Sequence, residues 1–455
     1  MTQRLFGTDG VRGVAGVWPL DPPTVARLGA AIVLERRSAA PSSHERRSAH
    51  PLSIVVGRDT RESGEWIERE LARGAASAGA TVTSIGVAPT PAVAYLAGAR
   101  DFDLGVVLSA SHNPFGDNGI KVFSGHGEKF GEADERAVEQ MMADSSWAVT
   151  TRAGVPIDAP ELLDEYIDHV QRLLPRTKAL SGGRIAVDLA NGATTTTAVR
   201  VLTAAGFEVL PIGHEPDGRN INLGCGSTHP ARLAGVVVEH KCRLGVAFDG
   251  DGDRAIFVDA RGHVVDGDAV LLMLAIWYQQ QQRLTGNTVV ATVMSNIGLE
   301  IALRERGIAM IRTPVGDKYV MEEMRRNGFV LGGEQSGHVI LTEHLPTGDG
   351  LATALAVLRT METSGSELAD LASALTTFPQ TLVNVRVKTK TPIDEVPEIQ
   401  AAVARVEAAL DGRGRVLVRY SGTEPLLRVM IEGEDQATVQ AWAEEIADAV
   451  RTTLG

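Results

Sequence analysis

Three aspartates at alternate positions are the clearest candidates for chemistry in this chain. The stretch DGDGDR contains Asp249, Asp251 and Asp253, and an extended backbone would direct their carboxylates to one side. The intervening glycines permit a tight loop. Hard oxygen ligands suit Mg²⁺, so the spacing predicts a magnesium site, with Arg254 placed to neutralise phosphate charge. The alternatives are a solvated acidic turn or an EF-hand, and the EF-hand is disfavoured because its downstream Glu and flanking helices are absent.

A second candidate is a serine at the end of an apolar run. The run 104–108 stops at Ser109, Ala110 and Ser111, which His112 follows directly. The loop does not match the G-x-S-x-G nucleophile elbow of hydrolases. Opposite a magnesium site, the Ser111 hydroxyl would instead carry a phosphoryl group, whose oxygens could complete the metal shell. Taken alone, the loop favours a turn or helix-cap role.

The stretch GEQSGH is a candidate for sugar recognition. It contains Glu334, Ser336 and His338 among glycines. Carboxylate and hydroxyl side chains are good partners for neighbouring sugar hydroxyls. A polar loop without function has the same composition, so the loop indicates a sugar site only together with the others.

The stretch RYSGTEP is a candidate phosphate site. Arg419 could make forked bonds to a phosphate, while Ser421, Thr423 and the nearby N–H groups would form an anion nest, and Arg428 would add charge. A simple β-turn is the alternative. Together the loops offer a phosphoryl carrier, a metal, a reader of hydroxyls and a phosphate clamp, which is what moving a phosphate around a sugar requires.

The elements that must position these loops repeat three times. Each unit begins with a short β-branched strand and a helix, in the stretches 53–64, 184–195 and 287–298. A second strand, a second helix and a third strand follow, and the third strand leads into one of the polar loops at Ser111, Asp249 and Glu334. Alternating strands and helices indicate parallel α/β layers. Ligands bind at the carboxyl ends of such strands, so the three loops could converge.

The tail has a different pattern. We expect a strand over 381–389, a helix over about 393–410, an antiparallel pair joined through RYSGTEP, and a final helix from about Asp435. One stretch fits no element: residues 35–51 are rich in Ser, Ala, Pro and Arg without an apolar period, which predicts an exposed flexible loop. A basic functional patch is the less favoured interpretation of that stretch.

Composition narrows the class of protein. The 455 residues suggest about three domains, and the net charge of −13 disfavours a general binder of nucleic acid. Only Cys225 and Cys242 are present, so a reducing cytoplasm is expected. The N-terminal residues lack the apolar core of a signal peptide. The apolar run from Ala269 is too short to span a bilayer and predicts a buried helix, so no membrane partner is expected.

The motifs of this chain resemble those of a known family. The chain is similar to the α-D-phosphohexomutase superfamily, and within it to the bacterial phosphoglucosamine mutases. The resemblance lies in segments spread in order over almost the whole chain: FGTDGVRG, SASHNPFGDNGIK, ANGAT, FDGDGDR, PVGDKYV, GGEQSGH and RYSGTEPLLRVMIEG. The subfamily is indicated by GTDGVRG, EQSGH, NPFGDNGIK and FPQTLVNV. The stretch 35–51 departs from the short connection that is usual in the family.

The resemblance implies a fold of three related mixed α/β-sheet domains plus a smaller C-terminal α+β domain around a central cleft. We place the phosphoserine loop in residues 1–155, the metal loop in 156–258, the sugar loop in 259–374 and the phosphate loop in 375–455. A hinge near 376–379 is expected to close the last domain. The sequence does not specify an oligomeric state, and a homodimer is compatible with it.

The resemblance also implies roles for individual residues. Ser111, rather than Ser109, would be the phosphoserine and the remaining protein-borne ligand of one Mg²⁺ held by the three aspartates. Basic positions around the reaction centre would be Arg12, Lys121, Arg254 and Lys318, with His112 beside the serine. The sugar loop would be Glu334, Ser336 and His338, and the phosphate site would be Arg419, Ser421, Gly422, Thr423 and Arg428.

The implied reaction interconverts glucosamine 6-phosphate and glucosamine 1-phosphate through glucosamine 1,6-bisphosphate, which serves as intermediate and activator. Lys121 and His338 are the candidates for general acid and base. The product would supply UDP-N-acetylglucosamine and cell-wall synthesis. Three alternatives remain: a phosphoglucomutase or phosphomannomutase, a sugar-phosphate-binding protein without turnover, and a metal-dependent phosphatase. Retention of Ser111 and all three aspartates disfavours the binding protein.

Overall fold

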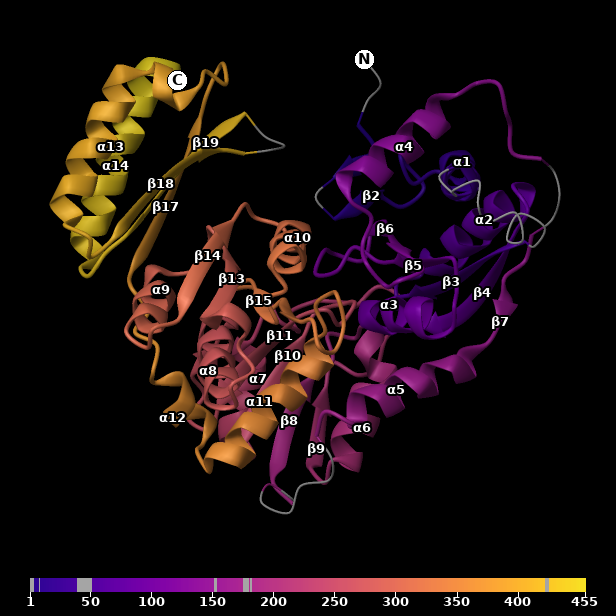
Figure 1. Ribbon diagram of the computed structural model, residues 1–455, viewed down its shortest axis with the longest axis horizontal. Coiled ribbons are helices and arrows are strands. Elements are labelled where there is room, and N and C mark those ends of the chain that lie inside the picture. Colours follow the sequence, from indigo (N-terminus) through magenta and orange to yellow (C-terminus); the bar gives the residue numbers. More distant parts are fainter. Residues whose placement is uncertain are drawn as a thin grey trace. The chain divides into compact units, whose positions relative to one another are not determined.

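The structure is a computed structural model that describes residues 4–7, 9–38, 51–150, 154–174, 180, 182–421 and 425–455. The chain forms two compact units: one of residues 1–294 and 308–374, and another of residues 295–307 and 375–455. The first unit contains three mixed sheets and the second contains one antiparallel sheet (Figure 1). The mixed α/β class predicted from the sequence is therefore confirmed, with four sheets where length alone suggested about three domains.

The first sheet has the order β1-β2-β6-β5-β3-β4-β7. Its strands are β1 (Phe6–Gly7), β2 (Gly10–Val14), β3 (Leu52–Arg58), β4 (Ala80–Val87), β5 (Leu104–Leu108), β6 (Asp117–Ser124) and β7 (Ile157–Asp158). Strands β3, β4, β5 and β7 are parallel, whereas β6 runs antiparallel to β5 and β2 antiparallel to β6. Its helices are α1 (Pro22–Ser38), α2 (Gly64–Ser77), α3 (Thr90–Ala99) and α4 (Glu132–Ala143).

The second and third sheets repeat the central part of the first. Their orders are β12-β11-β10-β8-β9 and β14-β13-β15-β16. The strands are β8 (Arg184–Asp188), β9 (Glu208–Ile212), β10 (Leu244–Phe248), β11 (Ala255–Asp259), β12 (Val264–Val265), β13 (Thr288–Thr292), β14 (Ala309–Thr313), β15 (Leu331–Gly333) and β16 (Val339–Leu341). The helices are α5 (Leu163–Gln171), α6 (Ala198–Ala204), α7 (Ala231–Glu239), α8 (Gly267–Gln280), α10 (Asp317–Asn327), α11 (Gly350–Ser364) and α12 (Leu368–Ala372).

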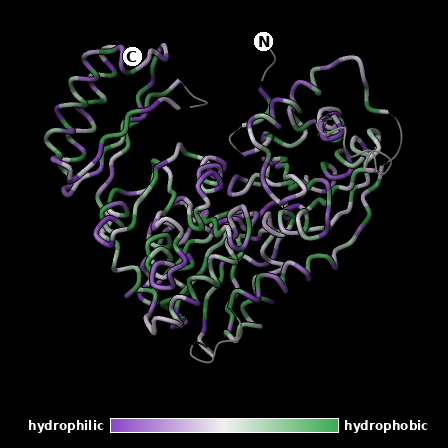
Figure 2. The backbone as a smooth tube through the Cα atoms, viewed as in Figure 1, coloured by the Kyte–Doolittle hydropathy of each residue, from purple (hydrophilic) through white to green (hydrophobic). Residues whose placement is uncertain are grey.

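Each of the three sheets turns from its third strand into an antiparallel fourth strand. These turns are β5 to β6, β10 to β11 and β15 to β16. The loops within them are the three polar loops that the sequence places after buried strands. Figure 2 shows that hydrophobic residues concentrate in the sheets, and every residue of β5 and β10 is buried. The rigid strands therefore carry the polar loops at their ends.

The second unit packs two helices on one three-stranded sheet. The sheet order is β17-β19-β18, all antiparallel, and α13 and α14 cover the same face (Figure 1). The elements are α9 (Ile297–Arg304), β17 (Gln380–Arg386), α13 (Pro397–Leu410), β18 (Arg415–Tyr420), β19 (Leu426–Glu432) and α14 (Gln436–Leu454). The predicted antiparallel tail is thus confirmed. The helix begins at Pro397 rather than near Ile393, because proline holds the preceding residue in an extended conformation.

Three further predictions concern single segments of the chain. The buried helix expected from Ala269 is α8. Residues 35–38 of the predicted loop belong to α1, where Glu35 is buried, and residues 39–50 lie outside the described residues. The expected hinge at 376–379 lies inside the second unit, where the Phe378 N–H and carbonyl both bond to the Asn296 side chain.

Candidate active site

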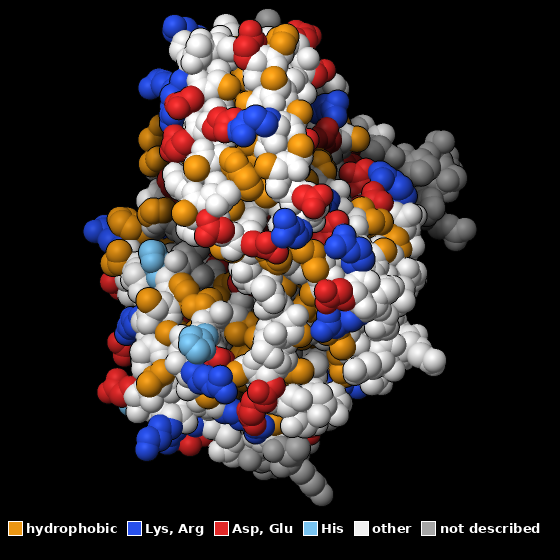
Figure 3. Space-filling model, turned by 90° about the vertical axis from the view of Figure 1, so that its left-hand side faces the viewer, with side chains coloured by type: hydrophobic (Ala, Val, Ile, Leu, Met, Phe, Trp, Pro, Cys, Tyr) orange, Lys and Arg blue, Asp and Glu red, His pale blue; other side chains and the backbone are white. Residues whose placement is uncertain are grey.

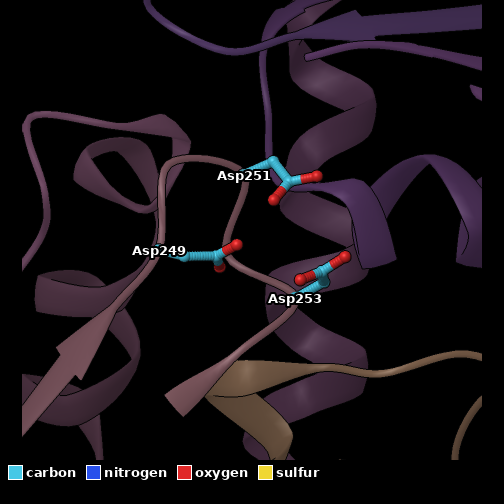
Figure 4. Close-up of side chains that lie close together, drawn as sticks. All are labelled: Asp249, Asp251 and Asp253. Atoms are coloured by element: carbon cyan, nitrogen blue, oxygen red, sulfur yellow. The ribbon is translucent and has the colours of Figure 1, made fainter. Parts of the chain in front are cut away.

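The metal loop runs from β10 to β11 and gathers three buried carboxylates. One ligand atom from each of Asp249, Asp251 and Asp253 lies within 4.8 Å of the others, and Figure 4 shows the three side chains arising from this one loop. A second observation indicates that a divalent cation fits this loop: Asp251 Oδ1 is buried and has no hydrogen-bond partner. An all-oxygen donor set with a free lone pair is what Mg²⁺ requires.

The charges of the loop repel one another. Burial first, and then the carboxylates of Asp253 and Asp251, raise the pKa of Asp249 well above its usual value. Burial also opposes ionisation of Asp253, but the charges of Lys121 and His338 outweigh it and lower its pKa. Such crowded carboxylates remain together only when cations offset their repulsion.

The backbone of the metal loop is fixed from three directions. The carbonyl of Gly250 accepts from Ala193 N–H at 2.8 Å, that of Asp251 from Thr90 N–H at 2.8 Å, and that of Gly252 from Gly350 N–H at 3.0 Å. These donors belong to segments beside the second, first and third sheets respectively. Gly252 has a φ of +72°, a conformation that favours glycine. All three sheets of the first unit thus hold one loop.

Ser111 lies directly against the metal loop. It is buried, it has a φ of +52°, and its Oγ donates a hydrogen bond to Asp249 Oδ2 at 2.5 Å. Ser109 has a different environment: its Oγ donates to Asp59 Oδ2 at 2.6 Å and accepts from Ser111 N–H at 2.9 Å. Of the two serines, only Ser111 directs its hydroxyl to an aspartate of the metal loop.

Arg61 holds the serine loop in place, and sequence reasoning missed it. The side chain is buried and paired with Asp59 at 2.8 Å. Its guanidinium donates to four carbonyl groups of the loop, those of Ser111, Asn113, Pro114 and Asp117. The available signal was the position of Arg61 in the stretch GRDTR, at the end of the first strand of the first of the three sequence repeats. Asn222 was also missed; it donates to the Ser111 carbonyl at 2.9 Å.

Three of the four basic residues predicted near the reaction centre, Lys121, Arg254 and Arg12, lie around the two loops. Lys121 Nζ is 2.8 Å from Asp251 and 3.3 Å from Asp253. Burial disfavours its charge, but these carboxylates outweigh burial and raise the pKa of Lys121 well above its usual value. Arg254 N–H donates to Asp249 Oδ1 at 3.1 Å, and Arg12 pairs with Asp9. A lysine held in its charged form is a strong electrostatic partner for an incoming phosphate.

His112 is neutral near neutral pH. Burial first, and then the charges of Arg254 and Arg12, lower the pKa of His112 to about 4. Its Nδ1 lies 3.2 Å from Arg254 Nη1 and 3.4 Å from Ser111 Oγ. The ring therefore contributes a neutral hydrogen-bonding group next to the serine rather than a charge.

The sugar loop joins β15 to β16. Glu334 accepts from Gly316 N–H at 3.1 Å, and Ser336 Oγ donates to Glu334 at 3.4 Å. His338 is buried with its Nδ1 3.5 Å from Asp253, so this loop meets the metal loop. Lys318 lies on α10, 3.6 Å from Glu135, in a pocket of about 660 Å³ whose lining does not include the metal-loop aspartates. The structure thus brings His338, but not Lys318, to the three carboxylates.

The phosphate loop lies in the second unit between β18 and β19. Arg419 and Arg428 are cross-strand partners, and burial first, then the charge of Arg428, lowers the pKa of Arg419. Two like charges on adjacent strands favour an anion between them. Lys390, which sequence reasoning missed, donates a hydrogen bond from its Nζ to the Ser421 carbonyl at 2.6 Å. Gly422 and Thr423 lie outside the described residues.

Four domain families of known proteins match successive stretches of this chain. Residues 3–148, 164–262 and 266–378 match alpha/beta/alpha domains I, II and III of phosphoglucomutase/phosphomannomutase, and residues 382–449 match its C-terminal domain. The phosphoglucosamine mutase of Syntrophotalea carbinolica is 45% identical over 100% of this chain and 99% of its own, and that of Frankia alni is 48% identical over 99% of both.

Solved structures share the fold. A phosphoglucomutase/phosphomannomutase family protein from Burkholderia thailandensis superposes with a TM-score of 0.80 at 24% identity, covering 99% of this chain and 98% of that chain. The N-acetylphosphoglucosamine mutase of Aspergillus fumigatus, solved with GlcNAc-6P and magnesium, has a TM-score of 0.70 at 17% identity, covering 99% and 96%. With its full-length relatives at 45–48% identity, the chain belongs to the phosphoglucomutase/phosphomannomutase family, and within it to the bacterial phosphoglucosamine mutases.

Proposed function

We propose that this enzyme interconverts glucosamine 6-phosphate and glucosamine 1-phosphate through a phosphoserine at Ser111. The observation that carries the proposal is the contact of Ser111 Oγ with Asp249 in a loop of three buried carboxylates. Full-length relatives named phosphoglucosamine mutase support the choice of sugar. A mutase is an isomerase, and the product would supply UDP-N-acetylglucosamine and cell-wall synthesis.

In the forward reaction, phosphoserine 111 transfers its phosphoryl group to the free O1 of glucosamine 6-phosphate. The bond from phosphorus to Ser111 Oγ breaks and a bond to the sugar O1 forms. The O1 proton passes to a general base, and Ser111 Oγ takes a proton from a general acid. The product of this step is glucosamine 1,6-bisphosphate. The bisphosphate then turns over in the site without leaving. In the second step the bond from phosphorus to the sugar O6 breaks and a bond to Ser111 Oγ forms. The Ser111 proton passes to a general base and O6 takes a proton from a general acid, which leaves glucosamine 1-phosphate and restores the phosphoserine.

Most of the acceleration in such transfers comes from positioning and electrostatics. Asp249, Asp251 and Asp253 would hold one Mg²⁺, which when bound offsets the negative charge of the phosphoryl group. Lys121 and Arg254, which lie beside the metal loop, would neutralise more of the negative charge of the phosphoryl group. Lys121 and His338 are the proposed acid and base.

Binding of the sugar phosphate would involve two further loops. Glu334 and Ser336 would bond the hydroxyls, and Lys318 would add a basic contact. Arg419, Ser421, Gly422, Thr423 and Arg428 would bind the phosphate that is not reacting. An arginine clamp reads a phosphate group rather than one face of the sugar, so it would accept both orientations of the bisphosphate. A cytoplasmic location and a homodimer remain predictions.

The first test compares substrates and two serine variants. With Mg²⁺ and a trace of the matching bisphosphate, we expect the highest kcat/KM for glucosamine phosphate among glucosamine, glucose and mannose phosphates. Ser111→Ala should abolish turnover and remove the phosphate that mass spectrometry finds on the 104–121 stretch, whereas Ser373→Ala, at an exposed serine, should change neither. Full activity of Ser111→Ala would refute the phosphoserine route, and a preference for glucose or mannose would refute the choice of sugar.

A further inference from the structure

Six side chains around the reaction centre form a closed ring that the reaction scheme does not use as a whole. Lys121 Nζ lies 3.0 Å from Asp9 Oδ2, and Lys129 Nζ lies 2.7 Å from Asp9 Oδ1 and also pairs with Asp317. The ring continues from Asp317 to His338, from His338 to Asp253 and from Asp253 back to Lys121, at 3.6, 3.5 and 3.3 Å.

Basic groups and carboxylates alternate around this ring. Its members come from the segments beside all three sheets of the first unit: Asp9, Lys121 and Lys129 from the first, Asp253 from the second, and Asp317 and His338 from the third. Each carboxylate lies between two basic groups of the ring, and Asp9 also pairs with Arg12 outside it. Removal of one basic group of the ring therefore takes one partner from each of two carboxylates. Broken buried ion pairs are costly for this reason.

Lys129 is the member whose loss would open the ring. Its ammonium contacts Asp9 and Asp317, and its side chain is 15% exposed. Burial opposes its charge, but the carboxylates of Asp317 and Asp9 outweigh burial and raise its pKa above its usual value. Lys129 also lines the pocket of about 660 Å³ that contains Lys318. Its ammonium is engaged by the two carboxylates, so a comparison of kcat with KM decides whether it acts through them or on the substrate.

We propose that Lys129 is a positioning residue for phosphoryl transfer, which ties Asp9 to Asp317 and thereby fixes Lys121 and His338 beside Asp253. The proposal rests on the proposed function, because it concerns the same reaction centre. Without Lys129, Asp9 would draw Lys121 away from Asp251 and Asp253, and Asp317 would keep only His338 among the ring's basic groups. Both changes displace groups assigned to the transfer step.

The test separates catalysis from binding. We expect Lys129→Met to lower kcat by about 10- to 100-fold, the size of effect that small displacements of reacting groups produce. KM should stay within about twofold, because the proposal assigns Lys129 no contact with the substrate. Lys129→Arg should recover most of kcat, since a guanidinium can bridge two carboxylates. Arg243→Met is the matched control: it removes another ion pair between distant segments, with Glu367 at 2.7 Å, and should leave kcat unchanged.

Three results would overturn the proposal: kcat of Lys129→Met within twofold of the unsubstituted enzyme, a rise in KM that accounts for the whole loss, or an equal loss in Arg243→Met. A second measurement needs no sugar and therefore distinguishes failure of this proposal from failure of the proposed function. In Lys129→Met, the Asp317 carboxylate loses its ammonium partner, and Asp317→Asn removes that carboxylate. The double variant Lys129→Met with Asp317→Asn should therefore have a melting temperature no lower than that of Lys129→Met alone. Additive losses in the melting temperature would show that the two residues are not coupled.

Discussion

Two serines that are two residues apart have different environments, and side-chain geometry decides between them. Ser109 bonds to Asp59, while Ser111, held at a positive φ, faces Asp249. A non-glycine residue in this conformation is strained and persists only where surrounding contacts impose it. Here the contacts are those of Arg61 and Asn222 with the Ser111 carbonyl.

At this scale we predict that Arg61→Met destabilises the enzyme by about 3–5 kcal/mol, because removal of one partner of a buried ion pair strands the other. Asp59 and four carbonyl groups would lose the hydrogen bonds that the Arg61 guanidinium donates to them. Arg73→Met is the control, since Arg73 pairs with Glu70 at the surface, where ion pairs contribute about 0–1 kcal/mol. Urea denaturation measures both changes, and equal losses would contradict the role of Arg61.

At the scale of elements, close packing of α1 on α2 depends on glycine. A Cβ added at Gly74 would lie 1.8 Å from the Ala26 carbonyl oxygen, and one at Gly29 would lie 2.3 Å from that of Leu71. The two helices therefore approach more closely than any side chain would allow. Their packing supports the first sheet, whose strands β5 and β6 carry the serine loop.

We predict that Gly74→Ala destabilises the enzyme by about 1–3 kcal/mol, the usual cost of overpacking. Gly235→Ala in α7 is the matched helical control, because nothing lies within 4 Å of the added Cβ. It should stabilise by up to about 1 kcal/mol through helix propensity. Opposite signs in thermal unfolding would confirm the contrast, and a neutral Gly74→Ala would show that the helices separate easily.

A stack of rings joins α3, α5 and the segment before α11. The His169 ring lies between Tyr95 and His344, with centroids 4.3 and 4.5 Å away. Burial first, and then the His344 and Arg172 side chains, lower the pKa of His169 to about 4. An unfolded histidine binds its proton near pH 6.5. Between these values the unfolded state holds more protons, so stability must fall as the pH falls from about 6.5 to 4.

Replacement of His169 by Phe keeps the stack and removes this titration. We predict that acidification from pH 7 to 5 costs the variant about 1–2 kcal/mol less than the unsubstituted enzyme, a range that takes account of the half-buried ring. Melting temperatures at the two pH values measure the difference. His214→Phe, at an exposed histidine, should retain the full acid sensitivity, and the same sensitivity in His169→Phe would remove His169 as its source.

At the scale of the whole molecule, the mixed charges on one face contrast with the charges concentrated in the reaction centre. On the face drawn in Figure 3, Lys and Arg side chains are interspersed with Asp and Glu. No helix among the described residues is both long and apolar enough to cross a membrane. The concentrated charges lie at the metal loop, whose backbone is bonded to segments beside all three sheets of the first unit.

We therefore predict that Mg²⁺ stabilises the enzyme as a whole, by about 2.7 kcal/mol at 100 times its Kd. Asp251→Asn should lose most of this increment, because Asp251 has a buried oxygen without a hydrogen-bond partner. Thermal melting with Mg²⁺ and with EDTA gives the difference, and Asp266→Asn at the start of α8 serves as the carboxylate control. An unchanged Mg²⁺ increment in Asp251→Asn would remove Asp251 from the metal site.

The sequence by itself determined the order of strands and helices, the antiparallel tail and the polar loops that follow buried strands. These features follow from local rules: hydrophobic periodicity selects the element, and glycine, serine and aspartate mark the loops. Only the tertiary structure decided which side chains meet. Lys121 reaches Asp251 across 130 residues and Lys129 reaches Asp317 across 188, because separate sheets pack around one loop. No local pattern encodes such pairs, since their partners are chosen by packing and by the need of buried charges for counter-charges.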